Sequence, residues 1–261
     1  MKRSEEQAIL ITGVAGLLGF KTAKHLLESG HRVIGVDLIT GNLVNKEARL
    51  LDLGIKLTSH NGNKLAEERS GDFSFFKADI RNSDFWGLVK EKYQISTVLH
   101  LAVSPAVVLD LQSPKNFALN HFIGFIHVLD FCIGAKVSRL FYKHTLEMEH
   151  QSSFGPVDEL FTLDNSIQWM NDHWATAYWE LYQLQSMALE LPIIPASMHE
   201  LEELRLMAEA KDYSFTSLGK QKYAEVDSIA LALVELIENR VEEFDQVACS
   251  VGLGHWKSLV E

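Results

Sequence analysis

The sequence contains little cysteine, little proline and no long hydrophobic run. Its 261 residues include two cysteines, Cys132 and Cys249, and five prolines. Two distant cysteines are too few for the disulfide framework of a small secreted domain, so we expect a reduced, cytoplasmic protein. No apolar run approaches the roughly 20 residues that a membrane helix needs, and no signal-peptide-like segment precedes the first expected strand. These absences argue against a membrane partner.

Positive charge is also scarce. The chain carries 24 Lys and Arg against 35 Asp and Glu, which gives a formal net charge of −11. No basic stretch offsets this balance, so we do not expect nucleic acid as a general partner. The proportions of 47% hydrophobic and 23% charged residues are typical of a globular protein. The length suits one large domain, or one domain with a small appendage.

A glycine-rich turn follows the first apolar run, residues 8–12. Glycines stand at positions 13, 16 and 19, and a helical pattern then runs from about 16 to 29. Gly13 suits a sharp turn, Gly16 a close approach of the backbone to a diphosphate, and Gly19 close packing of helix on strand. The helix N-terminus offers free N–H groups to an anion. Three glycines alone are a weak signal for a dinucleotide site.

An acidic residue ends the second expected strand, residues 31–37. Asp37 lies 18 residues beyond Gly19, where a carboxylate can accept both hydroxyls of an adenosine ribose. Its charge would repel a 2′-phosphate, which favours NAD over NADP. The alternative is a strand-end acid that only caps a turn.

Short apolar strands alternate with helical patterns along the first 145 residues. We expect further strands at 73–79, 96–102 and 137–144, and helices at 45–53, 83–93 and 113–134. Residues 60–71 are polar and predict an exposed excursion. This alternation predicts an α/β fold with a Rossmann-type, doubly wound parallel sheet.

Several short motifs together resemble one known family. They are Thr12-Gly13-x-x-Gly16-x-x-Gly19, Val36-Asp37, Ala78-Asp79-Ile80-Arg81, His100-Leu101-Ala102, and Ser113-Pro114 to Asn120 with Gly124. With them, the first 145 residues resemble the extended short-chain dehydrogenase/reductases, the NAD-dependent epimerase/dehydratase family of sugar-nucleotide enzymes. Residues 46–50 look most like UDP-glucuronate 4-epimerases.

The resemblance implies an NAD site and, as a possible ligand, a nucleotide sugar. It implies that Asp79 and Ile80 lie against the adenine, and that the 100–102 strand end lines the diphosphate and nicotinamide side. The candidate cofactor-binding residues are Gly13, Gly16, Leu17, Leu18, Gly19, Asp37, Asp79, Ile80, Leu101, Ala102 and Asn120.

The second half of the chain resembles the family less. Residues 218–230 resemble its late strand and following helix, and residues 247–252 its last strand. A short acidic helix at 197–210 replaces the longer substrate-binding lobe. We therefore predict an NAD-binding Rossmann domain over residues 1–190. Residues 191–261 form a small, shortened C-terminal lobe, with elements that return to the sheet.

The catalytic pair that the family implies is missing. The family uses a Tyr that moves the hydroxyl proton and a Lys four residues later that lowers the pKa of that Tyr, whereas no tyrosine here has a lysine four residues later. On the helix expected at 172–190, the Tyr position falls near residues 171–174, and if Trp174 holds it, Tyr178 takes the Lys position. At the preceding strand end, Thr145 matches the catalytic Ser or Thr, and Glu147 matches a base of dehydratase relatives.

Three hypotheses remain open for this region. The first is a working enzyme whose acid–base groups are Thr145, Glu147, His173 or Tyr178. The second is a catalytically silent NAD-binding regulator or scaffold, because a catalytic pair acts as a unit. The third is a metal site, which we do not favour because its ligands alternate faces on a strand. Its ligands would be His144, Glu147, Glu149 and His150.

A homodimer is the expected assembly. The segment 117–133 is apolar nearly all round, which predicts a helix buried on more than one side. In the family that the sequence resembles, two helices form a four-helix dimer interface. We expect the corresponding helices to be 114–134 and 172–190.

Overall fold

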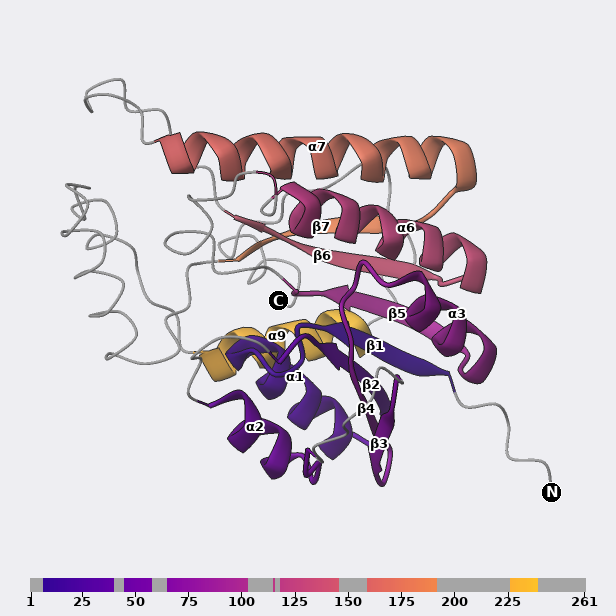
Figure 1. Cartoon of the computed structure of the whole chain (residues 1–261), viewed down its shortest axis with the longest axis vertical. Helices are drawn as coiled ribbons and strands as arrows, with labels where there is room; N and C mark the ends of the chain where they lie inside the picture. Colours follow the sequence, from indigo (N-terminus) through magenta and orange to yellow (C-terminus); the bar gives the residue numbers. More distant parts are fainter. Residues whose placement is uncertain are drawn as a thin grey trace.

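The computed structural model describes residues 7–39, 45–57, 65–102, 115, 118–145, 159–191 and 226–238. At its centre lies a seven-stranded sheet in the order β3-β4-β2-β1-β5-β6-β7 (Figure 1). Among the strands that the structure describes, only β3 runs antiparallel to its neighbour. The strands are β1 Ala8–Thr12, β2 Arg32–Asp37, β3 Glu67–Ser70, β4 Phe73–Lys77, β5 Ile95–His100, β6 Arg139–Thr145 and β7 Ser186–Leu191. The predicted α/β Rossmann-type fold is confirmed.

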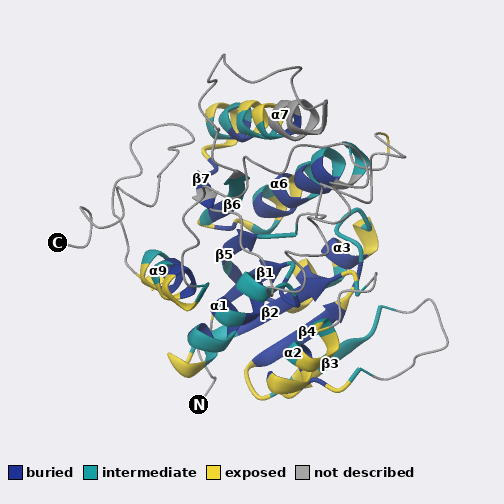
Figure 2. Cartoon of the chain, turned by 90° about the vertical axis from the view of Figure 1, so that its left-hand side faces the viewer, coloured by how far each residue is buried: buried dark blue, intermediate teal, exposed yellow. Residues whose placement is uncertain are grey.

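Helices cover both faces of the sheet. They are α1 Leu17–Glu28, α2 Lys46–Asp52, α3 Ser83–Lys92, the π-helix η1 Leu119–Ile123, α6 Gly124–Ala135, α7 Glu159–Tyr182 and α9 Val226–Glu238. Figure 2 shows α1 and α9 on one face, and α3, α6 and α7 on the other. Among the described helices, none is long and apolar enough to cross a membrane.

The two faces of the sheet carry separate cores because side chains alternate along each strand. On β1, Leu10 packs with α3, α6 and α7, while Ile9 and Ile11 pack with α1 and α9. All five residues of β1 are buried, as expected for a central parallel strand with helices on both sides. Burial of apolar surface on both faces stabilises the sheet.

The sheet order places a topological switch beside β1. The chain runs from β1 to β2 on one side, and returns to β5 on the other. Ligands of open α/β sheets bind outside the carboxyl ends of the strands at such a point. The ends of β1, β2, β4 and β5 are where the sequence analysis places its candidate cofactor residues.

The helix predicted at 172–190 is wrong at both ends. Helix α7 begins at Glu159 and ends at Tyr182, and residues 186–191 form β7, which pairs with β6. Gln183 adopts a φ of +59° directly after the helix, which ends it. One of the two helices proposed for the dimer therefore lies at 159–182.

Asn82 caps α3, because its side chain accepts a hydrogen bond from the Asp84 amide. Two smaller predictions also need correction. The helix predicted at 114–134 contains a π-helical turn at residues 119–123. The excursion predicted at 60–71 contains β3, which pairs with β4.

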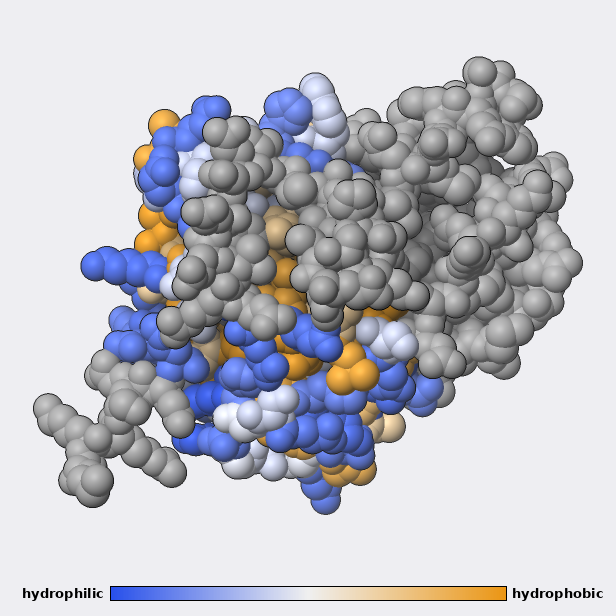
Figure 3. All heavy atoms as spheres, turned by 180° about the vertical axis from the view of Figure 1, so that it is seen from behind, coloured by the Kyte–Doolittle hydropathy of each residue, from blue (hydrophilic) through white to orange (hydrophobic). Residues whose placement is uncertain are grey.

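Strand β3 is polar along its length, which explains why its pattern did not predict a strand. Its sequence, Glu-Glu-Arg-Ser, places charged side chains on the edge of the sheet, where charge disfavours pairing with another chain. Figure 3, which shows the side opposite to that of Figure 1, has mostly hydrophilic side chains over the lower part of the described surface.

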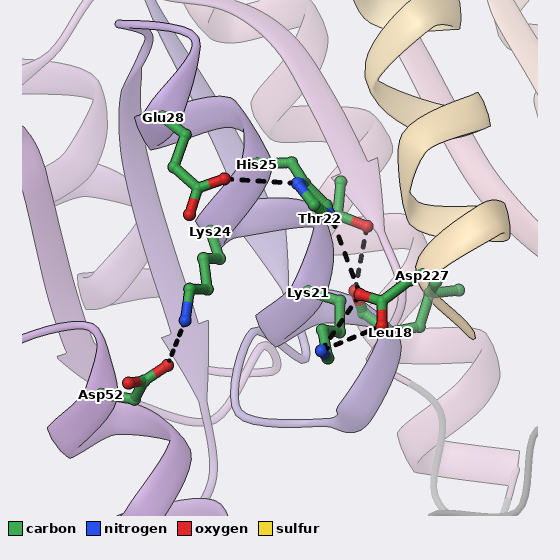
Figure 4. Close-up of polar contacts among 8 residues, drawn as sticks. All are labelled: Leu18, Lys21, Thr22, Lys24, His25, Glu28, Asp52 and Asp227. Atoms are coloured by element: carbon green, nitrogen blue, oxygen red, sulfur yellow. Dashed lines mark hydrogen bonds and ion pairs between the residues drawn. The ribbon is translucent and has the colours of Figure 1, made fainter. Parts of the chain in front are cut away.

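Helix α9 lies along α1 and runs in the same direction. Near its start, Asp227 lies 3.0 Å from Lys21 Nζ and 3.6 Å from His25 Nε2 (Figure 4). At its other end, Glu238 accepts from His31 at 3.0 Å. A segment far along the chain thus returns to the first half, although the division at residue 190 stays a prediction. The predicted elements at 197–210 and 247–252 lie outside the described residues.

Candidate functional site

The turn between β1 and α1 needs glycine at two positions. Gly13 has a φ of +73°, and a Cβ there would lie 2.8 Å from the backbone of Leu101 and Ala102. A Cβ on Gly19 would lie 2.4 Å from the Gly13 carbonyl oxygen. Real Cβ atoms do not approach backbone this closely, so the turn, α1 and the end of β5 fit together only with glycine.

Gly16 has a different environment. It is the N-cap of α1, makes no side-chain cap hydrogen bond, and is followed by a first turn without acidic residues. Among the described residues, a Cβ on Gly16 would meet only the Gly13 oxygen, at 3.0 Å. The first-turn amides of Leu17, Leu18 and Gly19 lie at the positive end of α1, which suits a diphosphate.

Asp37, at the end of β2, is held by two donors. The Ala15 amide donates to Oδ2 at 3.0 Å, and Lys46 Nζ donates to Oδ1 at 2.7 Å. Asp37 is 5% exposed. The carboxylate is thereby fixed beside the glycine turn, where an adenosine ribose is expected.

Two basic residues of α2 face this turn, and the sequence analysis did not name them as site residues. Lys46 contacts Asp37, and Arg49 Nη1 donates to the Ala15 carbonyl at 3.1 Å. They lie three residues apart, which places them on one face of the helix. The signal for them was present, since residues 46–50 carried the likeness to UDP-glucuronate 4-epimerases.

A buried hydrogen-bond chain fixes the end of β5. The Ala102 amide donates to Thr12 Oγ1 at 3.1 Å, and Thr12 Oγ1 lies 2.7 Å from His100 Nδ1. Burial, reinforced by the nearby His121, lowers the pKa of His100 to about 3, so the ring is neutral near pH 7. Thr12 Oγ1 and His100 Nδ1 share one hydrogen bond, and the chain orders the backbone of Leu101 and Ala102.

Asp79 and Ile80 lie just beyond β4, and both already have partners within the chain. Asp79 accepts from Arg81 Nη2 at 2.5 Å and from the Arg81 amide at 2.8 Å. Burial alone would raise the pKa of Asp79, but the Arg81 hydrogen bonds outweigh it and lower that pKa. The Ile80 carbonyl accepts from Trp86 Nε1 at 2.6 Å, and its side chain packs under Gly124. Asn120 lies in η1, and its side chain is outside the described part.

Two of the proposed acid–base residues have partners on helices. Tyr178 donates to Asp130 of α6 at 2.5 Å, and burial together with this carboxylate raises the pKa of Tyr178. His173 is exposed on α7 and donates to the Trp169 carbonyl at 2.8 Å. Its ring packs at a tilt against the Trp169 ring, with the two ring centroids 4.1 Å apart. A raised pKa keeps Tyr178 protonated near neutral pH, so its phenolate is not available as a base. The contacts of His173 lie along its own helix.

The other two candidates lie at the end of β6. Thr145 is its last residue, with a side chain outside the described part, and Glu147 lies outside the described residues altogether. Within the residues that the structure describes, no group of three or more His, Cys, Asp or Glu side chains could hold a metal ion. Glu147, Glu149 and His150 of the metal hypothesis are not among them.

Asp172 links α7 to β6 through two side chains that the sequence analysis did not pair with it. Tyr142 donates to Asp172 Oδ1 at 2.7 Å, and His144 Nδ1 lies 3.2 Å from Asp172 Oδ2. Burial and the Asp172 charge raise the pKa of Tyr142, so it stays a donor. The His144 contact is an ion pair only when the ring is protonated, and it places His144 beside a carboxylate.

The comparisons with known proteins agree with this geometry. Residues 9–187 match the NAD dependent epimerase/dehydratase family. The chain is 26% identical over 245 residues to an uncharacterized 37.6 kDa protein in the cld 5′ region of Escherichia coli O111:H-. It is 27% identical over 189 residues to Protein CapI of Staphylococcus aureus, and 30% identical over 131 residues to a UDP-glucuronate 4-epimerase of Thermodesulfobacterium geofontis.

These matches cover 87%, 69% and 50% of this chain, but only 68%, 52% and 37% of the three relatives. Solved structures share the fold at low identity. A UDP-glucuronic acid 4-epimerase from Bacillus cereus, in complex with NAD, has a TM-score of 0.66 at 20% identity, over 94% of this chain and 77% of that one. DesIV, a dTDP-glucose 4,6-dehydratase from Streptomyces venezuelae with NAD and TYD bound, has a TM-score of 0.62 at 18% identity, over 89% and 72%.

The glycine turn, the acid at the end of β2 and the match over more than half of the chain lead to one conclusion: the chain belongs to the NAD-dependent epimerase/dehydratase family.

Proposed function

We propose that the chain binds NAD and is a divergent epimerase/dehydratase-like enzyme that acts on a nucleotide sugar with atypical acid–base residues. The observation that carries the NAD part is Asp37, fixed by the Ala15 amide beside a turn whose Gly13 and Gly19 admit no side chain. The nucleotide sugar follows from the relatives, of which one is named a UDP-glucuronate 4-epimerase.

Different residues at the carboxyl edge would bind different parts of the cofactor. The first-turn amides of α1 would hold the diphosphate, Asp37 the adenosine ribose, and Asp79 with Ile80 the adenine. Leu101, Ala102 and Asn120 would border the nicotinamide side. When bound, NAD supplies a ring that takes up and returns a hydride.

The acid–base role belongs to the end of β6 in this proposal. Thr145 and Glu147 are the first candidates by their match to the family pattern. His144 joins them because its Nδ1 lies 3.2 Å from the Asp172 carboxylate. Tyr178 and His173 have a weaker claim, because Tyr178 donates to Asp130 and His173 to its own helix.

The alternative is a catalytically silent NAD-binding regulator or scaffold, favoured by the absence of any Tyr-x-x-x-Lys pair. It predicts bound dinucleotide, no turnover, and a protein partner in pull-down. The enzyme hypothesis predicts turnover of at least one nucleotide sugar or related alcohol.

A homodimer through α7 and the helix before β6 remains part of the proposal. Exposed apolar and aromatic side chains on α7 support it, and they are Trp169, Met170, Trp174, Leu181 and Tyr182. Helix α6 lies beside α7 in Figures 1 and 2, so the two form one continuous surface. A cytoplasmic location and the division at residue 190 are proposals on the sequence grounds given above.

An NMR assay of the purified chain with NAD and a panel of UDP- and dTDP-sugars tests the function. We expect conversion of one class of sugar by the wild type. Thr145→Ala, Glu147→Gln and His144→Gln should each abolish it, while His31→Gln, which changes a residue that contacts Glu238 of α9, should not. Conversion that survives all three changes would overturn the assignment to β6, and no conversion over the whole panel would favour the silent subunit.

A further inference from the structure

We infer that the adenosine-ribose end of the cofactor site is neutralised by Lys46, and that this lysine allows a phosphate on the ribose 2′-position. The inference rests on the proposed function, since it assumes that a dinucleotide binds at the glycine turn. It names a specificity-determining residue, and it changes the ligand class from NAD alone to nucleotides with or without a 2′-phosphate.

The first step concerns the charge of Asp37. A strand-end acid that stands alone disfavours NADP, because its carboxylate repels the 2′-phosphate. Asp37 does not stand alone, since Lys46 Nζ lies 2.7 Å from Oδ1. The side chains are 5% and 17% exposed, so solvent screens the pair only in part. One ammonium group thus balances the one carboxylate at this end of the site.

The second step concerns Arg49, one helical turn further along α2. Its Nη1 donates to the Ala15 carbonyl, the residue whose amide donates to Asp37. Arg49 and Asp37 therefore both bind Ala15, and Lys46 binds Asp37, so two cations lie near this one carboxylate. The other acid nearby on α2 is Glu47, in the first turn and exposed to solvent.

The cations beside Asp37 affect whether a 2′-phosphate can bind there. A 2′-phosphate placed beside Asp37 would also lie near Lys46, whose ammonium group has three N–H donors and could donate to the phosphate while it keeps its contact with the carboxylate. A hydrogen bond to a charged group contributes about 10- to 100-fold in affinity. This gain offsets the repulsion by Asp37, so the site should tolerate a phosphate that a lone acid would reject.

The test uses two probes that lack nicotinamide and differ only in the 2′-phosphate. Adenosine 5′-diphosphate and its 2′-phosphorylated form are titrated calorimetrically into the full chain, after removal of any co-purified nucleotide. The variants are Lys46→Met, which removes the charge, and Lys46→Arg, which keeps it. Lys24→Met is the matched control, because Lys24 pairs with Asp52 at the other end of α2. Thermal unfolding checks that each variant is folded.

We expect the wild type to bind both probes with affinities within about tenfold of each other. Lys46→Met should weaken the 2′-phosphorylated probe by about 10- to 100-fold and the plain diphosphate much less. Lys46→Arg should retain binding of both, and Lys24→Met should change neither. If the wild type binds the diphosphate but rejects its 2′-phosphorylated form, or if Lys46→Met weakens both equally, the inference is wrong and the proposed NAD site stands. If neither probe binds, the NAD site itself is wrong.

Discussion

The two halves of the carboxyl edge differ in how their residues are held. On the β1–β2–β5 side, the expected cofactor residues sit in a turn where a Cβ on Gly13 would lie 2.8 Å from neighbouring backbone. On the β6–α7 side, Tyr142 and His144 meet Asp172, and the family's Tyr-x-x-x-Lys pair is absent. Backbone packing therefore preserves the first side, whereas side chains alone determine the chemistry of the second.

The largest expected effect comes from the glycine turn. Gly13→Ala forces a Cβ into the backbone at a φ of +73°, which should lower the free energy of unfolding by about 2 to 5 kcal/mol and abolish NAD binding. Gly30→Ala is the control, since Gly30 has a φ of +85° but open space around it, and should cost about 1 to 2 kcal/mol. Urea denaturation measures both. Equal losses would show that the turn has room for a side chain.

A pH effect of similar size should come from two buried histidines. Burial lowers the pKa of His100 to about 3 and that of His121 to about 4. Both are neutral when folded, whereas the unfolded chain takes up protons below about pH 6.5. Stability should therefore be complete above pH 7 and fall as the pH drops toward 5, by up to about 2 kcal/mol for each histidine.

Chemical denaturation at pH 7.5 and pH 5 measures this loss. His100→Gln should remove about half of the pH dependence, while His173→Gln, which changes an exposed histidine, should leave it intact. An unchanged pH profile in His100→Gln would mean that burial does not keep the His100 ring neutral in the folded protein.

The link between β6 and α7 should give a smaller effect. Tyr142→Phe removes the Tyr142 hydroxyl that donates to the Asp172 carboxylate and should lower the free energy of unfolding by about 1.5 to 3 kcal/mol. Tyr182→Phe, on α7 like Asp172, is the control, because this tyrosine is 54% exposed, and its cost should stay within about 0.5 kcal/mol. A neutral Tyr142→Phe would remove the structural link on which the role of His144 depends.

The smallest effect is expected where α9 meets α1. Asp227 contacts Lys21 and His25, and the Lys21 hydrogen bond lowers its pKa against a weaker opposing effect of burial. Its side chain is 55% exposed, so Asp227→Asn should cost less than about 1 kcal/mol. The loss should shrink further in 1 M salt, which thermal unfolding at two salt concentrations would show. A larger, salt-independent loss would mean that the pair holds α9 in place.

Local sequence was enough to predict most strands but not every element. The apolar runs of β1 and β2 were enough to predict these strands without information on tertiary contacts. Strand β3 was missed because pairing with β4 holds its polar residues extended. Residues 186–191 suit a helix or a strand by pattern, and the φ of Gln183 and the pairing with β6 make them a strand.

The candidate site shows the same limit. The sequence revealed Gly13, Gly16 and Gly19 because they lie within seven residues of one another in a single turn. The contact of Lys46 with Asp37 and that of His144 with Asp172 join different elements, and each depends on how a helix docks on the sheet. Side-chain pairs of this kind follow from tertiary packing, so spacing along the chain did not reveal them.

Native mass spectrometry of the purified full chain, before and after addition of NAD, tests the central claim most directly. The account predicts one dinucleotide for each chain, already bound or taken up on addition, in the wild type and in His144→Gln, and its loss in Gly13→Ala. A chain that keeps its own mass in every case, even with excess NAD, would contradict the claim that the cofactor side of the site is intact.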